Sequence, residues 1–142
     1  MKITTKKAKK RLALLWLSAS GILILIVIFQ TLNGRYAGSE EKAWAWLLPL
    51  FLPTLALILS TFVIENRDNK SEIKYADIFF YKLTFALTIF YFFLIYITIF
   101  MQPLLKEDPI TIMCKSNLWL IPIQGLVAIS LGAFFIKKGD IK

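Results

Sequence analysis

Four long runs without a single Asp, Glu, Lys or Arg divide this chain of 142 residues. The hydrocarbon core of a membrane is about 30 Å thick and needs about 20 helical residues at about 1.5 Å each. Backbone groups in lipid must pair within their own segment, so each run, 21 to 23 residues long, predicts a transmembrane helix. The predicted spans are residues 12–34, 43–64, 83–105 and 116–136.

The fold that follows is an all-α membrane protein, a single domain over residues 1–142 with four transmembrane helices in an antiparallel bundle. Composition agrees, because 58% of the residues are apolar and 18% are charged, against roughly 45–50% and about 25% in soluble domains. The chain has no His and one Cys, which excludes His-ligated metal sites and an internal disulfide. We therefore predict no cofactor and no metal.

Lys and Arg lie mostly on one side of the predicted spans. Of the 17 such residues, 13 fall in an N-terminal arm (1–11), in the loop 65–82 or after residue 136. Positive charge marks cytoplasmic flanks, so we expect both termini in the cytoplasm and the protein in a bacterial plasma (inner) membrane. Four tryptophans are expected to be interfacial anchors: Trp16 near the inner boundary, and Trp44, Trp46 and Trp119 near the outer one.

The basic arm predicts a partner for the cytoplasmic face. The net charge of +8 collects on this side, and each basic group near a bilayer surface contributes about 1 kcal/mol of attraction to anionic lipid. Anionic membrane lipid is therefore the expected partner, and no nucleic acid is expected. The loop 65–82 is also a candidate docking surface for a cytoplasmic protein. The expected lipid contacts are Lys6, Lys7, Lys9, Lys10 and Arg11.

Small residues recur at helical spacing in the second and fourth spans. Positions three and four apart share one helical face, and small side chains let helix backbones approach closely. A proline inside a helix also frees a carbonyl that a neighbouring helix or water must satisfy. These faces are predicted to pack against helices; alternatively, the second helix starts only at Pro49. The helix-packing residues are Pro53, Ala56, Ser60, Gly125, Ala128 and Gly132.

The third span carries a polar stripe on an otherwise Phe-rich helix. A polar stripe should face protein or water and turn the aromatic rings to lipid. One interpretation is a hydroxyl-lined path through an oligomer. The other is hydrogen bonding between helices, or from each hydroxyl back to its own helix. The stripe consists of Thr84, Thr88, Tyr91, Thr98 and Gln102.

Polar side chains also gather in the predicted outer half of the membrane, where Gln30, Gln102 and Gln124 form a candidate cluster. They predict a partly hydrated vestibule. Alternatively, polar side chains near helix ends reach the interface, which would account for Gln30 and Gln102 but not for Gln124. An amide as deep as Gln124 needs a hydrogen-bond partner.

No ionisable residue lies inside any predicted span. Such residues usually mark ion coupling, proton relays or voltage sensing, so an ion-coupled carrier is disfavoured. The sequence also has no nucleotide-binding glycine loop and no nucleophile with an adjacent base. We therefore predict that the protein is not an enzyme and has no catalytic residues.

These features predict a non-enzymatic integral membrane protein that self-associates as a homo-oligomer. It would be a channel-like or membrane-perturbing subunit, or a membrane sensor or anchor for a cytoplasmic partner. The competing prediction is a small-solute carrier or lipid-handling membrane enzyme with its site in the outer half of the bundle. The four-span layout resembles that of membrane components of bacterial two-component antiviral systems, such as the membrane subunit of Kiwa; this resemblance in topology implies antiviral defence and transfers no residue role.

Overall fold

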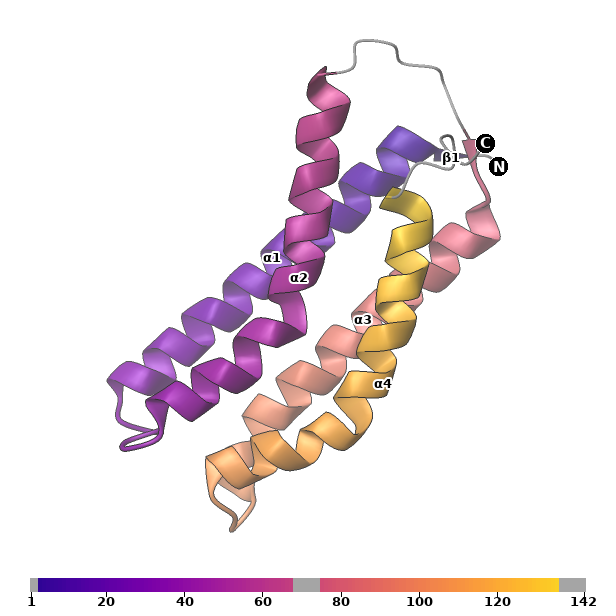
Figure 1. Cartoon of the computed structure of the whole chain (residues 1–142). Coiled ribbons are helices and arrows are strands. Elements are labelled where there is room, and N and C mark those ends of the chain that lie inside the picture. The colour runs from indigo at the N-terminus through magenta and orange to yellow at the C-terminus, as the bar shows by residue number, and fades with distance from the viewer. Residues whose placement is uncertain (1–2, 68–74, 136–142) are drawn as a thin grey trace.

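Four long helices make up most of the computed structural model, which describes residues 3–67 and 75–135 (Figure 1). They are α1 (Thr5–Leu32), α2 (Glu40–Arg67), α3 (Ile78–Met101) and α4 (Pro109–Phe135), and a short 3-10 helix, η1 (Gln102–Leu104), follows α3. Each long helix is long and apolar enough to cross a membrane. This confirms the predicted helical fold, with four helices that could each cross a membrane by their length and composition.

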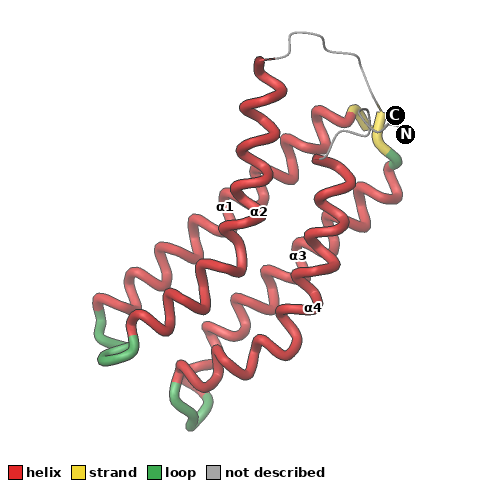
Figure 2. The backbone as a smooth tube through the Cα atoms, viewed as in Figure 1, coloured by secondary structure: helices red, strands yellow, loops and turns green. Residues whose placement is uncertain are grey.

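Some predicted segments fall outside the described residues. These are the first two residues of the basic arm, residues 68–74 of the loop 65–82, and residues 136–142, which include the end of the fourth predicted span. The described part of the chain adds two very short strands, β1 (Ile3–Thr4) and β2 (Tyr75–Ala76), which pair in antiparallel register (Figure 2). This pairing ties the start of α1 to the segment that leads into α3.

The helices extend beyond the charge-free runs on which the spans were predicted. α1 begins at Thr5, inside the basic arm, and α4 begins at Pro109 rather than at residue 116. Lys and Arg are good helix formers, so a charge marks the edge of the lipid rather than the end of a helix. α2 likewise runs from Glu40 through both of its prolines, so it does not start at Pro49.

The chain forms two helical hairpins. α1 lies alongside α2, and α3 alongside α4, with the connections 33–39 and 102–108 at the same end of the molecule (Figure 1). The start of α1, the β1–β2 pair and the end of α4 lie at the opposite end. At the start of α3, the Asp77 carboxylate accepts a 2.9 Å hydrogen bond from the Phe79 backbone N–H, which caps the helix.

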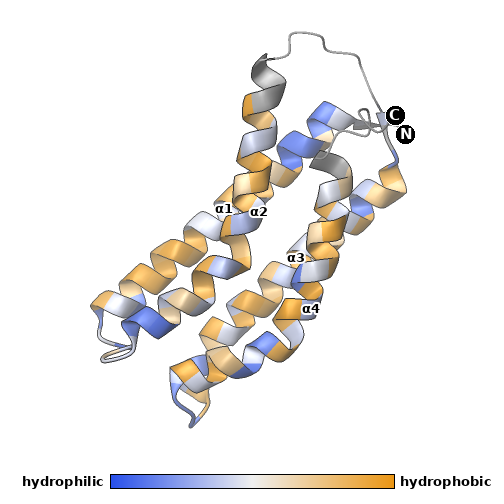
Figure 3. Ribbon diagram, in the orientation of Figure 1, coloured by the Kyte–Doolittle hydropathy of each residue, from blue (hydrophilic) through white to orange (hydrophobic). Residues whose placement is uncertain are grey.

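Both the core of the protein and the outer surface of the helices are apolar. Buried residues from all four helices form one cluster, which includes Trp16, Phe51, Tyr91 and Leu120. Large apolar side chains also cover the outside, and Leu118 is 80% exposed. Figure 3 shows hydrophobic residues along the helices and hydrophilic ones mainly towards their ends. A water-soluble monomer rarely exposes so much contiguous apolar surface, so this exterior suits a lipid environment.

Trp16 differs from its expected place at the membrane interface. Its side chain is fully buried, and its ring packs edge-on against Phe92, with ring centroids 4.8 Å apart. Position 16 falls on the same face of α1 as the buried Leu12 and Leu23. The position of residue 16 on the helix therefore turns this side chain into the bundle. Trp46 is also buried, and its Nε1–H donates to the Ser116 hydroxyl at 3.0 Å, whereas Trp119 is exposed on α4 as an interfacial anchor would be.

Candidate functional site

The centre of α2 contains a carbonyl that has lost its helical partner. Pro53 has no backbone N–H, so the carbonyl of Pro49, four residues earlier, receives no hydrogen bond within the helix. The side chain of Gln124 on α4 fills this position, because its Nε2 donates to the Pro49 carbonyl at 2.9 Å. The same nitrogen lies 3.3 Å from the carbonyl of Leu50. The side-chain amide of Gln124 therefore gains an acceptor, and the free carbonyl of Pro49 gains a donor.

Tyr91 on α3 reaches the same place. Its hydroxyl donates to the Leu50 carbonyl at 2.8 Å, and its side chain is fully buried. Two adjacent carbonyls of α2 thus accept hydrogen bonds from α3 and from α4. We call Pro49, Leu50, Tyr91 and Gln124 the proline site. In lipid, where no bulk water can satisfy a carbonyl, such contacts hold helices in register.

The remaining hydroxyls of the polar stripe bond within α3 itself. Each threonine hydroxyl donates at 2.9 Å to the backbone carbonyl four residues earlier, an arrangement common for threonine in transmembrane helices. All three threonines are buried and face the interior of the four helices. These hydroxyl hydrogens are therefore engaged, as is that of Tyr91. The threonines concerned are Thr84, Thr88 and Thr98.

Gln102, the last residue of the stripe, belongs to a second polar cluster near the connection 33–39. Its Oε1 accepts a 3.1 Å hydrogen bond from Nε of Arg35 and lies 3.4 Å from the hydroxyl of Tyr36. That hydroxyl donates to Oε1 of Gln30 at 2.5 Å. Gln102 is 2% exposed, and among the described residues its Nε2 has no hydrogen-bond partner. This loop cluster ties the α1–α2 connection to the end of α3.

Burial raises the pKa of Tyr36 above its usual value, and the desolvation of the phenolate is the largest cause. The positive charge of Arg35 and the hydrogen bond with Gln102 act in the opposite direction but do not cancel it. Tyr36 is therefore a neutral phenol at physiological pH, able to donate its proton to Gln30.

The three glutamines predicted as one outer-half cluster are therefore divided. Gln30 and Gln102 meet at the Tyr36 hydroxyl, whereas Gln124 bonds to α2 at the proline site. Tyr36 and Arg35 were not predicted to take part, because nothing in the sequence shows that the connection folds back on the end of α3. The sequence did indicate that an amide as deep as Gln124 needs a hydrogen-bond partner. It also indicated that Pro53 leaves a backbone carbonyl free to accept one.

The predicted helix-packing residues lie on the outside of the chain. Only Gly132 among them is partly buried, and a Cβ added at Gly125 would have no atom within 4 Å. Three of them, Pro53, Gly125 and Ala128, line a surface groove of about 350 Å³ between α2 and α4, which we call the small-residue groove. These residues therefore do not bring two helices of this chain together. The exposed members are Pro53, Ala56, Ser60, Gly125 and Ala128.

The basic arm is largely helical, as the first two turns of α1. Four of the five expected lipid contacts (Lys6, Lys7, Lys10 and Arg11) are exposed. Lys9 departs from this expectation, because it is only 6% exposed. It lies three residues before the buried Leu12, so the helical phase turns it inward and away from the lipid-facing surface.

Comparison with known proteins gives no matching family model, no similar curated protein and no similar solved structure.

Proposed function

We propose that this chain is a non-enzymatic membrane protein that works as an assembly of several copies, joined through the small-residue groove. In this arrangement the four helices form an antiparallel bundle with both termini in the cytoplasm of a bacterial cell. The observation that carries the proposal is the exposure of Gly125 and Ala128 on the α4 side of that groove, with Pro53 exposed on the α2 side. Small residues let helices of two chains approach closely in lipid.

The assembly would serve as a membrane anchor or sensor for a cytoplasmic protein. Exposed cations on the first turns of α1 supply the charged face that such a partner or an anionic membrane surface would contact. A channel-like role needs polar groups directed at a water-filled path. It is less well supported, because the stripe hydroxyls of α3 are buried and bonded to backbone carbonyls.

The test is the mass of the complex in mild detergent. We expect the wild-type chain to give a multiple of the single-chain mass by light scattering. Gly125→Leu and Ala128→Leu, which fill the groove, should weaken association by about tenfold or more, the effect of losing about 1.4 kcal/mol of packing. Ala45→Leu on α2 is the matched control, since Ala45 is also exposed but does not line this groove.

A carrier or lipid-handling protein with its site at Gln124 is the second candidate, because this amide also lines the small-residue groove. The same variants distinguish the two. A complex whose mass is unchanged by Gly125→Leu and Ala128→Leu would contradict the assembly and favour a solute or lipid in the groove. A wild-type protein with the mass of a single chain would likewise contradict the assembly and favour a solute or lipid in the groove.

A further inference from the structure

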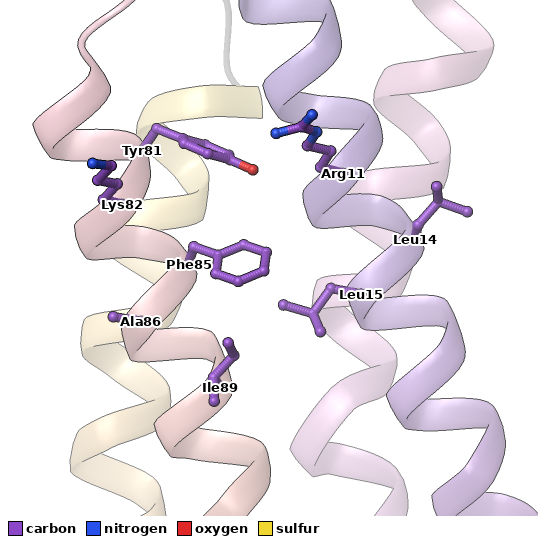
Figure 4. Close-up of a pocket in the computed structure, with 8 residues that line it drawn as sticks. All are labelled: Arg11, Leu14, Leu15, Tyr81, Lys82, Phe85, Ala86 and Ile89. Atoms are coloured by element: carbon purple, nitrogen blue, oxygen red, sulfur yellow. The ribbon is translucent and has the colours of Figure 1, made fainter. Parts of the chain in front are cut away.

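A second and larger groove lies between α1 and α3, close to the N-terminal end of each helix (Figure 4). Its volume of about 580 Å³ falls within the range of roughly 300–1,000 Å³ that is usual for ligand sites. Neither the proline site nor the small-residue groove shares a residue with it. The residues that matter here are Arg11 and Leu15 on α1, and Tyr81, Lys82, Phe85 and Ile89 on α3.

The groove is polar at one end and apolar along the rest. In Figure 4, Arg11 and Tyr81 extend towards each other from the two helices, and Lys82 lies at the same level on the side of α3 away from Arg11. One turn deeper, Leu15 and Phe85 point towards each other across the gap. Ile89 continues the apolar wall, about 10 Å along the helix axis from Lys82 at about 1.5 Å per residue.

The two cations have no fixed counter-ion within the chain as described. Arg11 and Lys82 are both exposed, and neither pairs with a carboxylate among the side chains that the structure describes, those of residues 4–63, 75 and 77–133. A guanidinium binds phosphate through two parallel hydrogen bonds, and a lysine ammonium on its flexible stem can approach the same anion. The mouth of the groove is therefore suited to a phosphate.

The depth of the groove indicates what must be attached to that phosphate. One leaflet contributes about half of the 30 Å hydrocarbon core, so a wall of about 10 Å next to the cations matches the upper part of an acyl chain. A free phosphate would leave the walls formed by Leu15, Phe85 and Ile89 uncovered. A soluble peptide would have to place its backbone in lipid without hydrogen-bond partners.

We propose that this groove binds one anionic phospholipid, with its phosphate held by Arg11 and Lys82 and an acyl chain along Leu15, Phe85 and Ile89. The proposal rests on the proposed topology, since the groove then opens to the cytoplasmic leaflet, where anionic lipid meets basic pockets between helices. It assigns a bound lipid to each copy of the chain, which is distinct from the diffuse attraction of the basic arm.

Native mass spectrometry of the full chain in mild detergent tests the proposal. The protein is titrated with phosphatidylglycerol, which is anionic, and with phosphatidylcholine, which is neutral. We expect one phosphatidylglycerol to bind per chain and phosphatidylcholine to bind at least about tenfold more weakly. The double variant Arg11→Gln/Lys82→Gln should weaken phosphatidylglycerol binding about 25-fold, since each basic group near a bilayer surface contributes about a fivefold factor.

Lys6→Gln/Lys7→Gln is the matched control, because it removes two exposed cations that do not line the groove. It should change binding less than about twofold. Ala86→Trp, which fills the groove without changing charge, should weaken binding of both lipids. Equal losses in the two double variants, or equal binding of the two lipids by the wild type, would overturn the proposal. Native mass spectrometry counts the lipids bound to each chain. A failure of lipid binding can therefore be told apart from a failure of assembly through the small-residue groove.

Discussion

The side-chain amide of Gln124 donates a 2.9 Å hydrogen bond to the backbone carbonyl of Pro49, the acceptor that Pro53 leaves without a partner in α2. The contact joins two helices through groups that would each be costly alone in lipid. It also depends on the proline, because any other residue at position 53 would offer its own N–H to that carbonyl.

A double-mutant cycle between positions 124 and 53 should show this dependence. Gln124→Leu alone is expected to lower the free energy of unfolding by about 1 kcal/mol, within the range measured for hydrogen bonds between membrane helices. In a Pro53→Ala background, the backbone N–H gained at position 53 can satisfy the carbonyl, so the same change should cost clearly less. The measurement is reversible unfolding in mixed micelles. Equal costs in both backgrounds would show that Gln124 does not serve the carbonyl freed by Pro53.

Tyr91 and Thr88 should respond differently, although both belong to the polar stripe. Tyr91→Phe removes a donor that joins α3 to α2 and should cost about 0.5–1.5 kcal/mol of unfolding free energy. Thr88→Val removes a hydroxyl that bonds only within α3. Its loss leaves the Thr84 carbonyl with its helical partner, so the cost should be below about 0.5 kcal/mol.

Ion leakage from liposomes tests the other interpretation of the stripe. We expect leakage to be the same for the wild-type chain, for Thr88→Val and for Thr88→Val/Tyr91→Phe, since these hydroxyls are buried and bonded to backbone carbonyls. Leakage by the wild type that falls in both variants would contradict this and indicate that the stripe lines a path.

Tyr36 predicts a loss of stability in alkaline solution. Because burial raises the pKa of Tyr36 in the folded chain, the unfolded chain releases this proton first, near its ordinary pKa of about 10. The unfolded state then binds fewer protons than the folded state, so stability falls as pH rises above about 10 and is unaffected by this group below it. Unfolding of the wild type and of Tyr36→Phe, compared between pH 8 and 11, checks this. The stability difference between them should shrink above pH 10, and a constant difference would be the contrary result.

The sequence could predict the number of spans, because the length of an apolar run depends only on the thickness of the membrane. It also predicted that a deep amide and a helix-breaking proline each need a partner. It could not predict that Gln124 and Pro49 would be each other's partner, since this depends on which faces of α2 and α4 meet. Likewise, the charge of Lys9 indicated lipid, but the phase of α1 buries it.

The small residues show another limit. Spacing placed Gly125 and Ala128 on one face of a helix, but it could not distinguish a contact within the chain from one between chains. The structure leaves both exposed beside the small-residue groove. Similarly, the groove between α1 and α3 brings together Arg11 and Lys82, which are 71 positions apart, so no local pattern could signal it.

The topology of the chain is tested most directly by labelling its single cysteine in intact cells. Cys114 is exposed on α4, near the end that should face the cell exterior. A membrane-impermeant thiol reagent should therefore label Cys114 in intact cells. In a Cys114→Ser background, Lys7→Cys should be labelled only after the cells are broken. The reverse pattern, with Lys7→Cys labelled in intact cells and Cys114 protected, would contradict a four-span protein whose basic end lies in the cytoplasm.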